Sequence, residues 1–271
     1  MLSEKLKHIL HHIPPAITGV YFFMDEHDRI IYIGKSNDIR KRVQQHFQHT
    51  TSKAVRMQHQ VHQVKYENMG NELMALLRES ELIKAHKPVF NRALRRSVFL
   101  WGLYLVDTED GYLALKLQKI NKEQRELMAF TAKTEGKEYL FRITERYQLC
   151  QKINGLYPSK GACFQFTLKT CKGACIGIEP TWMYNERVRQ FVQDVSLPNE
   201  NQVLLLDGRT EGERGVVLIE NGVYRGYGFF KGELEKDVRL SDVIQSKTDD
   251  RDSQRLLRAY LRKQHSTAQG N

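Results

Sequence analysis

The sequence predicts an α+β protein whose first domain, residues 15–94, has a small, mostly antiparallel sheet flanked by helices. Two apolar runs rich in β-forming residues, Gly19–Met24 and Arg29–Gly34, are joined by a short polar loop, which is typical of a hairpin. The segment Gly70–Lys87 has the apolar periodicity of a helix, and Pro88 ends it.

Two further elements complete this first domain. A helix is expected to start near Asp38, because Ile39, Val43 and Phe47 recur at four-residue spacing. The segment Val61–Glu67 alternates apolar and polar residues, as a half-buried strand does. The predicted order is therefore β-β-α-β-α.

A second region, residues 95–197, is expected to contain a linker hairpin and a metal site. Its hairpin is predicted from Val98–Asp107 and Tyr112–Ile120, and residues 134–149 are predicted to form a helix. All cysteines of the chain lie in this region.

The third region, residues 198–271, is expected to be rich in β-structure and resembles no family that we can assign. Strands are predicted at Gln202–Leu206 and within Gly215–Phe230, where Asn221-Gly222 is a strong hairpin turn signal. A charged helix over about 250–264 closes the chain.

Composition points to a soluble protein with a polyanionic partner. Of the 271 residues 41% are hydrophobic and 27% charged, and the net charge is +10. Such a surplus suits nucleic acid or an anionic membrane surface, although solubility alone is an alternative explanation. No stretch approaches the roughly 20 apolar residues of a membrane span. Without a secretory signal, a cytoplasmic location with reduced cysteines is expected.

Two tyrosines of the predicted hairpin are candidate site residues. With a four-residue loop, Tyr21 and Tyr32 would lie directly opposite each other, so that their hydroxyls emerge from one face of the sheet. The alternative is a pair of tyrosines that only pack. Gly34 follows at the end of the strand, where a glycine permits close approach of a backbone or a ligand, and Lys35 comes next.

The predicted helices contribute charged candidates. Arg42 and His46 are four residues apart and share one helical face, which could otherwise be a solvated basic face. Glu79 lies among apolar residues at every helical neighbour position. A carboxylate there must be paired or bind a cation, and Mg²⁺ or Mn²⁺ suits its oxygen ligands. The alternative is a buried salt bridge to Arg42 or Lys35.

Five basic residues lie at the end of the predicted helix Gly70–Lys87 and just beyond it, between residues 84 and 96. With no acidic residue among them, these side chains could neutralise backbone phosphates. Together with Gly34 and Lys35 they form the expected DNA contacts: Lys84, Lys87, Arg92, Arg95 and Arg96.

The four cysteines lie within 26 residues, which favours a shared metal site over scattered core thiols. They are Cys150, Cys163, Cys171 and Cys175. Four thiolates suit tetrahedral zinc or an iron–sulfur cluster, and the spacing alone favours zinc.

The motifs of the first domain resemble the signature of the GIY-YIG nucleases. Gly19-Val20-Tyr21 is followed by Tyr32-Ile33-Gly34, with Arg42, Glu79 and Asn91 at the expected later positions. The stretch Leu76-Leu77-Arg78-Glu79-Ser80-Glu81-Leu82-Ile83-Lys84 is similar to the UvrC family, and the similarity extends over residues 12–190. His46 stands where UvrC proteins have a tyrosine.

The resemblance implies a DNA endonuclease that uses one divalent cation. Tyr32 would orient or deprotonate the attacking water, aided by Tyr21 or His46. Arg42 would hold the scissile phosphate and Glu79 would bind the cation. Asn91 would support the site through hydrogen bonds. Because a phenol ionises only near pH 10, Lys35, Arg42 and the cation would have to lower its pKa.

The resemblance also bears on cofactor and partner. The matching cysteines of UvrC proteins are associated with a 4Fe–4S cluster, which favours iron over zinc here. The layout resembles the short Cho-type members of the family, which implies one nick on the 3′ side of a lesion, with a UvrB-type loading protein. The alternatives are a structure-specific or mobile-element GIY-YIG endonuclease, and a non-catalytic DNA-binding module.

Overall fold

The computed structural model describes residues 4–91, 99–121, 123–234, 236 and 238–268. The chain forms two compact units, of which the first combines Met1–Arg96 with Leu197–Asn271 and the second is Ser97–Ser196. Among the described helices, none has the length and apolar character needed to cross a membrane.

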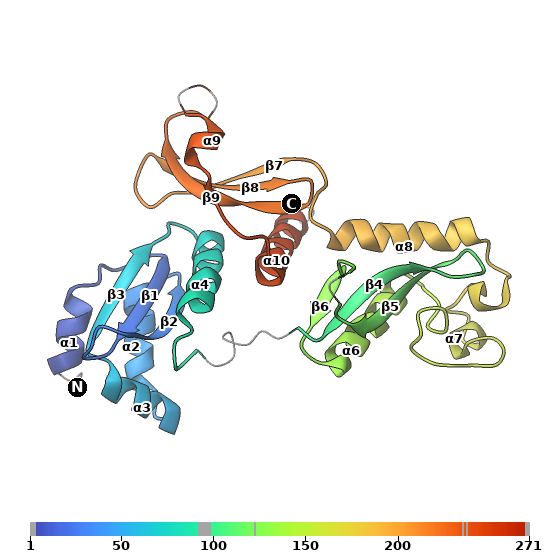
Figure 1. Cartoon of the computed structure of the whole chain (residues 1–271), viewed down its shortest axis with the longest axis horizontal. Coiled ribbons are helices and arrows are strands. Elements are labelled where there is room, and N and C mark those ends of the chain that lie inside the picture. The colour runs from blue at the N-terminus through green and yellow to red at the C-terminus, as the bar shows by residue number, and fades with distance from the viewer. Residues whose placement is uncertain (1–3, 92–98, 122, 235, 237, 269–271) are drawn as a thin grey trace. The chain divides into compact units, whose positions relative to one another are not determined.

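The first unit is built on a three-stranded antiparallel sheet of order β2-β1-β3 (Figure 1). Its strands are β1 (Gly19–Met24), β2 (Ile30–Ser36) and β3 (Gln63–Asn68). The helices are α1 (Glu4–His11), α2 (Ile39–Gln48), α3 (Ser52–Gln60) and α4 (Glu72–His86). The predicted order of strands and helices is confirmed, and α3 is an addition to it.

Alternation along β1 divides the first unit into two cores. Val20 and Phe22 point to the face that packs against α4. Tyr21 and Phe23 point to the opposite face, which α1, α2 and α3 cover. Consecutive side chains on β1 therefore belong to different cores, because successive side chains of a strand point to opposite faces of the sheet.

The register of the hairpin differs from the predicted one. Tyr21 pairs with Gly34, and Phe23 pairs with Tyr32, so the expectation that Tyr21 lies directly opposite Tyr32 is wrong. Asp28 adopts a left-handed φ of 57° in a loop longer than predicted. A bulge follows at Ile31, because Met24 already pairs with Ile30. Because of this extra residue, Tyr32 lies on the same face of the sheet as Tyr21. If the register had continued from the Met24–Ile30 pair without a bulge, Tyr32 would lie on the opposite face.

The second unit contains another three-stranded sheet, of order β5-β4-β6. Its strands are β4 (Trp101–Asp107), β5 (Leu113–Lys119) and β6 (Met128–Phe130). The helices are α6 (Lys133–Arg146), α7 (Phe164–Thr167), the short 3₁₀ helix η1 (Ala174–Ile176) and α8 (Thr181–Val195). The predicted hairpin and the helix α6 are confirmed.

The C-terminal segment forms a four-stranded sheet of order β10-β9-β8-β7. It contains β7 (Gln202–Asp207), β8 (Glu213–Glu220), β9 (Val223–Lys231) and β10 (Gln245–Ser246), with helices α9 (Leu240–Val243) and α10 (Arg251–Ala268). Asn221 and Gly222 have φ of 50° and 72° at the turn between β8 and β9, which confirms the predicted turn.

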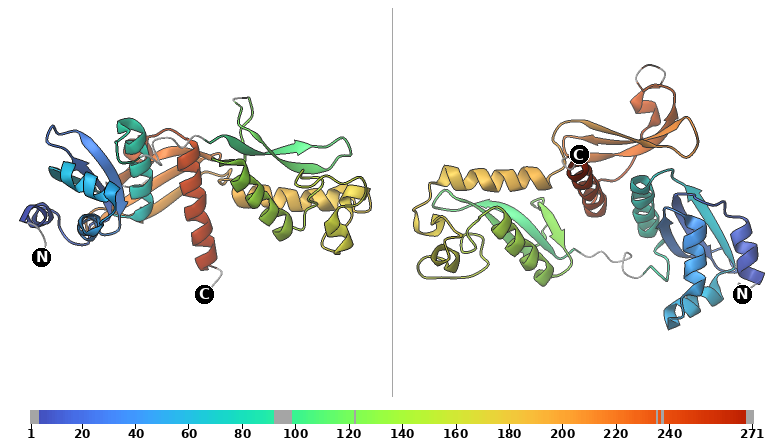
Figure 2. Two further views of the ribbon diagram at one scale, coloured as in Figure 1. Left: turned by 90° about the horizontal axis from the view of Figure 1, so that it is seen from below. Right: turned by 180° about the vertical axis from the view of Figure 1, so that it is seen from behind.

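The C-terminal sheet and α10 pack on α4, within the core that α4 shares with the first sheet. Figure 2 shows α4 between the first sheet and α10. Leu73 and Ile83 of α4 share this core with Val217 of β8 and Leu257 of α10, all at most 1% exposed. A helix that is apolar on two sides needs two layers to bury it. Residues 197–271 supply the second layer.

Candidate active site

The predicted site residues of β1, β2 and α2 converge on the face covered by α2. The Tyr21 hydroxyl lies 2.7 Å from Nε2 of His46. The ring centroids of Tyr21 and Tyr32 are 6.0 Å apart, and those of Tyr32 and His46 are 5.1 Å apart. Tyr21 is fully buried, whereas Tyr32 and His46 are half-buried. The three side chains form one aromatic group with polar atoms at its edge.

Gly34 makes room for the phenol of Tyr21. A Cβ atom at this position would lie 2.4 Å from the Tyr21 hydroxyl and 2.5 Å from the ring carbon that bears it. The sequence analysis expected Gly34 to admit a backbone or a ligand. In the structure the group that approaches it is the tyrosine on the neighbouring strand.

Burial and hydrogen bonding act differently on the two phenols. Burial raises the pKa of Tyr21, and its hydrogen bond with Tyr32 raises it further. Burial also raises the pKa of Tyr32, but the same hydrogen bond and the Arg42 guanidinium oppose that rise. Arg42 thus acts in the expected direction, although burial outweighs it. Of the two phenols, Tyr32 is the one whose ionisation this hydrogen bond favours.

His46 is held in its neutral form. Burial lowers the pKa of His46 to about 4, and the positive charge of Arg42 contributes to the decrease. A neutral imidazole can accept a proton or a hydrogen bond on one nitrogen. The histidine therefore remains a potential proton acceptor at neutral pH.

Arg42 is exposed on α2. Its charge lowers the pKa of four groups, which are Tyr21, Tyr32, His46 and Glu79. These groups come from two strands and two helices, so the guanidinium lies within electrostatic reach of the whole site. An exposed guanidinium there can meet an anionic substrate.

Asn91 binds the free edge of β2. Its Oδ1 accepts a hydrogen bond of 2.8 Å from the Ile33 N–H, and its Nδ2 donates one of 2.7 Å to the Ile33 carbonyl. The neighbouring Phe90 N–H donates to the Ile31 carbonyl at 3.0 Å. The segment after α4 therefore satisfies the strand edge beside Tyr32. The supporting role expected for Asn91 is directed at the main chain of β2.

Glu79 binds the same edge of β2 one step further along the strand, at Lys35. Its Oε1 accepts a hydrogen bond of 2.9 Å from the Lys35 N–H. Burial raises the pKa of Glu79, and Lys35 and Arg42 oppose that rise. The Lys35 ammonium group pairs instead with Glu72. The structure therefore shows a main-chain contact where the alternative interpretation expected a salt bridge, and Oε2 has no hydrogen bond among the described residues.

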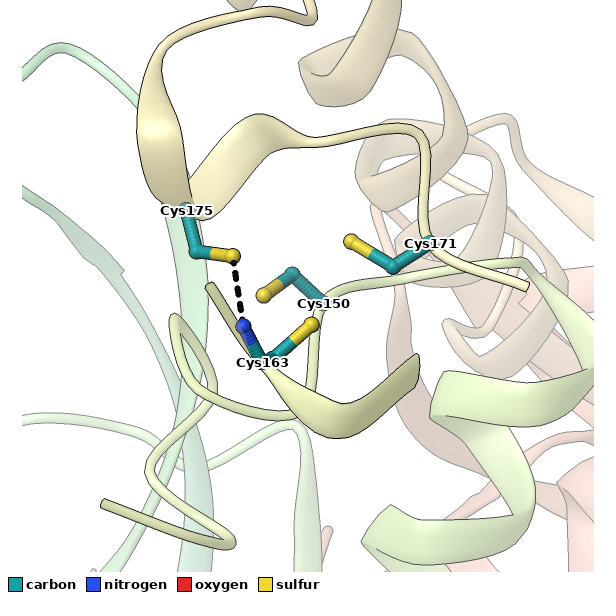
Figure 3. A group of neighbouring side chains, drawn as sticks. All are labelled: Cys150, Cys163, Cys171 and Cys175. Carbon is teal, nitrogen blue, oxygen red and sulfur yellow. Dashed lines mark hydrogen bonds between the residues drawn. The ribbon is translucent and has the colours of Figure 1, made fainter. Parts of the chain in front are cut away.

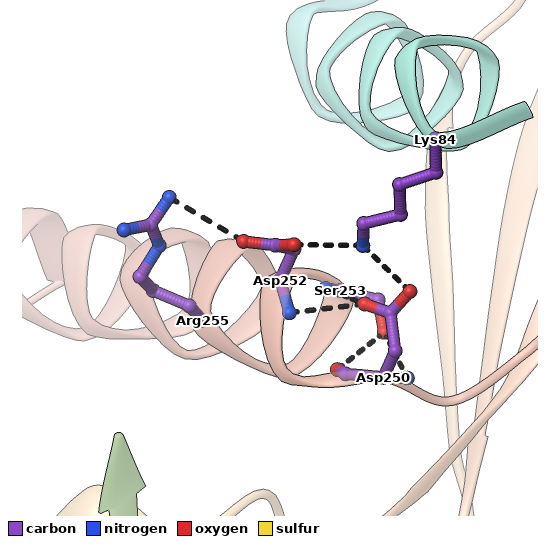
Figure 4. A network of polar contacts seen from close by, with 5 residues as sticks. All are labelled: Lys84, Asp250, Asp252, Ser253 and Arg255. Atoms are coloured by element: carbon purple, nitrogen blue, oxygen red, sulfur yellow. Dashed lines mark hydrogen bonds and ion pairs between the residues drawn. The ribbon is translucent and has the colours of Figure 1, made fainter. Parts of the chain in front are cut away.

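The expected DNA contacts are only partly on a free surface. Lys84 forms ion pairs of 2.6 Å with Asp250 and 2.7 Å with Asp252 (Figure 4). Its charge is thereby neutralised by the C-terminal segment, which argues against a phosphate contact. The same argument applies to Lys35, which pairs with Glu72. Lys87 is exposed just after α4.

The three remaining candidates for DNA contacts lie outside the described residues. They are Arg92, Arg95 and Arg96.

The four cysteines of the second unit meet at one point. Their Sγ atoms all lie within 4.8 Å of one another and face a common centre (Figure 3). Cys175 Sγ accepts a hydrogen bond of 3.3 Å from the Cys163 N–H. Cys163 precedes α7, and Cys175 lies in η1. The arrangement is compatible with a metal ion bound by four thiolates.

Two models of known protein families match this chain. Residues 17–92 match the model of the UvrC-like GIY-YIG domain, so the first sheet and its helices are a GIY-YIG domain. Residues 102–194 match the model of the UvrC/Cho excinuclease middle domain. The chain therefore belongs to the UvrC/Cho family of the GIY-YIG superfamily.

Individual relatives show the extent of the similarity. Excinuclease Cho of Salmonella typhimurium is 36% identical over 61% of this chain and 57% of its own length. Excinuclease Cho of Escherichia coli is 34% identical over 70% of this chain and 64% of its own. The chain thus spans less than two thirds of these relatives.

UvrABC system protein C of Clostridioides difficile is 28% identical over 92% of this chain and 40% of its own length. A match of this extent includes part of residues 198–271, which the sequence analysis left unassigned. Among solved structures, the magnesium-bound N-terminal endonuclease domain of Thermotoga maritima UvrC is 28% identical, with a TM-score of 0.30. It covers 33% of this chain and 99% of that domain.

We predict that Gly34→Ala destabilises the first unit. The new methyl group would force the Tyr21 ring away from His46, and overpacking of this kind costs about 1–3 kcal/mol. Urea unfolding followed by circular dichroism measures the change. The control is Gly161→Ala, where a Cβ atom meets nothing within 4 Å. Equal stability of the two variants would show that Tyr21 can move at no cost.

A second prediction concerns acid stability. Because the folded chain holds the pKa of His46 at about 4, the unfolded chain binds the extra proton first as the pH falls below about 6.5. Stability should therefore decrease between pH 6.5 and 4. His46→Gln should remove part of that decrease, equivalent to about 3 °C in Tm between pH 7.5 and 5.

Thermal unfolding at the two pH values tests this, with the exposed His59→Gln as the matched control. An identical pH dependence in the wild type and in His46→Gln would contradict the prediction.

Proposed function

We propose that this protein is a cation-dependent DNA endonuclease that nicks one strand of damaged DNA in nucleotide excision repair, in the cytoplasm. The observation that carries the proposal is the convergence of Tyr21, Tyr32, His46 and Arg42 at the edge where Glu79 binds β2. Membership of the UvrC/Cho family supports it.

The aromatic group handles the proton of the attacking water. Tyr32 orients the water and accepts its proton, because the hydrogen bond from Tyr21 stabilises the ionised form of Tyr32. The neutral His46 contacts the Tyr21 hydroxyl and extends this chain of hydrogen bonds. Arg42 binds the scissile phosphate and neutralises charge that develops on its oxygens.

Glu79 fits a divalent cation of the Mg²⁺ or Mn²⁺ type. The carboxylate is half-buried, and only one of its oxygens is bound to the main chain of Lys35. Hard cations prefer such an oxygen ligand and retain several waters when few side chains are available. When bound, a cation would stabilise the leaving 3′ oxygen. Departure of that oxygen leaves a 3′-hydroxyl and a 5′-phosphate.

The position and number of cuts follow from the Cho-type relatives and from the site. One tyrosine–arginine–glutamate constellation is present in the described part of the chain, so one nick is expected rather than excision of a fragment. By similarity to Cho, the nick falls on the 3′ side of the lesion, with a UvrB-type protein as the loader. The relatives named excinuclease Cho that support this proposal are 34–36% identical to this chain.

We also propose that the four cysteines bind a metal centre with a structural role. Similarity to UvrC proteins favours a 4Fe–4S cluster. Zinc is the alternative, since sulfurs around one tetrahedral zinc lie about 3.8 Å apart for Zn–S bonds of about 2.3 Å, within the 4.8 Å limit seen here. In either case the centre would tie Cys150, which follows α6, to Cys163 before α7 and to Cys171 and Cys175 at η1.

The catalytic proposal is tested by Glu79→Gln. The variant should lose about 100-fold or more of the Mg²⁺-dependent nicking, because the cation loses its carboxylate, while folding and duplex affinity remain. Glu26→Gln, at an exposed carboxylate of the loop between β1 and β2, is the control. The substrate is a duplex with one bulky adduct, labelled at each end of both strands, with and without the loading protein.

Near-normal nicking by Glu79→Gln would exclude Glu79 from the mechanism. Two cuts flanking the lesion by this protein alone would contradict a single site. A double-strand break in undamaged DNA would favour a mobile-element endonuclease instead, and binding without any cut would favour a non-catalytic DNA-binding module.

The metal proposal is tested by elemental analysis of anaerobically purified protein. We expect about four irons per chain, as one cubane cluster requires, and a loss of metal in Cys171→Ser. A content of one zinc and no iron per chain would show that the cysteines bind zinc and not an iron–sulfur cluster. Absence of both metals would leave only a group of buried thiols.

A further inference from the structure

The second unit exposes an unusual amount of apolar surface around its cysteines. Seven of the twelve exposed large apolar side chains in the described part of the chain lie within residues 157–183. Trp182 is 69% exposed, Phe164 68% and Ile178 62%. Soluble proteins rarely expose such a cluster without a partner. Six of these residues make up what we call the cysteine-site surface: Tyr157, Phe164, Leu168, Ile176, Ile178 and Trp182.

The cysteines explain why these side chains point outward. Phe164 and Ile176 each directly follow a cysteine whose Sγ atom faces the centre. Phe164 and Leu168 are four residues apart and share one side of α7, where the Leu168 N–H donates to the Phe164 carbonyl. Ile178 is held by a hydrogen bond from its N–H to the carbonyl of Gly173, the residue that precedes η1. Phe164, Leu168, Ile176 and Ile178 are therefore held in place by the turns that carry Cys163 and Cys175.

The charges of this region have a single sign. Residues 147–178 contain four lysines and no aspartate or glutamate. Lys160, Lys169 and Lys172 are exposed. The next acid, Glu179, is buried and paired with Arg187 at 2.7 Å. A ligand of this surface thus meets aromatic rings beside uncompensated positive charge.

We propose that the cysteine-site surface binds single-stranded or unpaired DNA, by stacking bases on Trp182, Phe164 and Tyr157 while the lysines bind phosphates. Aromatic platforms beside basic side chains are how proteins bind single strands. Protein–protein interfaces also use aromatic residues, but they are depleted in lysine. Paired bases inside a duplex are not accessible for stacking, so unpaired strands should be preferred. The proposal rests on the proposed function only in taking DNA as the ligand.

Binding is measured in the Glu79→Gln background, so that the result does not depend on nicking. A labelled single-stranded oligonucleotide and its duplex are compared by fluorescence anisotropy. We expect tighter binding of the single strand, about tenfold loss for Trp182→Ala and for Phe164→Ala, and no loss for Leu205→Ala, which removes an exposed leucine of β7. Quenching of Trp182 fluorescence by the single strand should accompany binding.

Charge is tested separately. Lys169→Ala combined with Lys172→Ala should reduce the salt dependence of single-strand binding by a slope of about 1.4, since each phosphate contact to a single strand contributes about 0.7. Metal content equal to that of the parent protein shows that each variant is folded. Unchanged single-strand affinity in Trp182→Ala and Phe164→Ala would overturn the proposal. Loss of binding to a purified UvrB-type protein, with DNA affinity intact, would also overturn it and assign the surface to a protein partner.

Discussion

The hydrogen bonds along the free edge of β2 hold the candidate active site together. Phe90, Asn91 and Glu79 bind the main chain of three alternate residues, Ile31, Ile33 and Lys35. An open sheet edge otherwise exposes unpaired N–H and C=O groups. Here the groups that close it include two of the expected site residues. Any movement of α4 relative to β2 would therefore change the position of Tyr32 and of the Glu79 carboxylate together.

The C-terminal segment determines how firmly α4 is held. Ion pairs join Lys84 to Asp250 and Asp252, and Glu81 to Lys247, and Leu257 of α10 belongs to the same apolar core as α4. Glu81 and Lys84 follow Glu79 on α4 by two and five residues. A carboxylate that is only half-buried gains a defined position from a helix packed on two sides. The segment thus contributes to the site without supplying a side chain to it.

Local rules predicted most elements of the fold, whereas contacts distant in sequence escaped prediction. The apolar runs of the first hairpin, the stop at Pro88 and the turn at Asn221-Gly222 are each encoded within a few residues. The longer loop and the bulge at Ile31 have no comparable signal, and together they shifted the partner of Tyr21 by two residues, from Tyr32 to Gly34. Candidate residues were identified by their type and spacing. Their hydrogen-bond partners depend on packing across 44 or 58 residues of sequence, as for Glu79 and Asn91.

The electrostatics of the site explain why the tyrosine and the carboxylate belong to one mechanism. The negative charge of Glu79 raises the pKa of Tyr32, whereas Arg42 lowers it. With a divalent cation bound, the net charge at Glu79 would become positive, and its effect on Tyr32 would change sign. Binding of the cation would then favour both departure of the leaving oxygen and ionisation of the phenol. Tyr32, which is half-buried and a poor base in the free protein, would become a better base when the cation is bound. That dependence would limit the proposed reaction to the cation-loaded site.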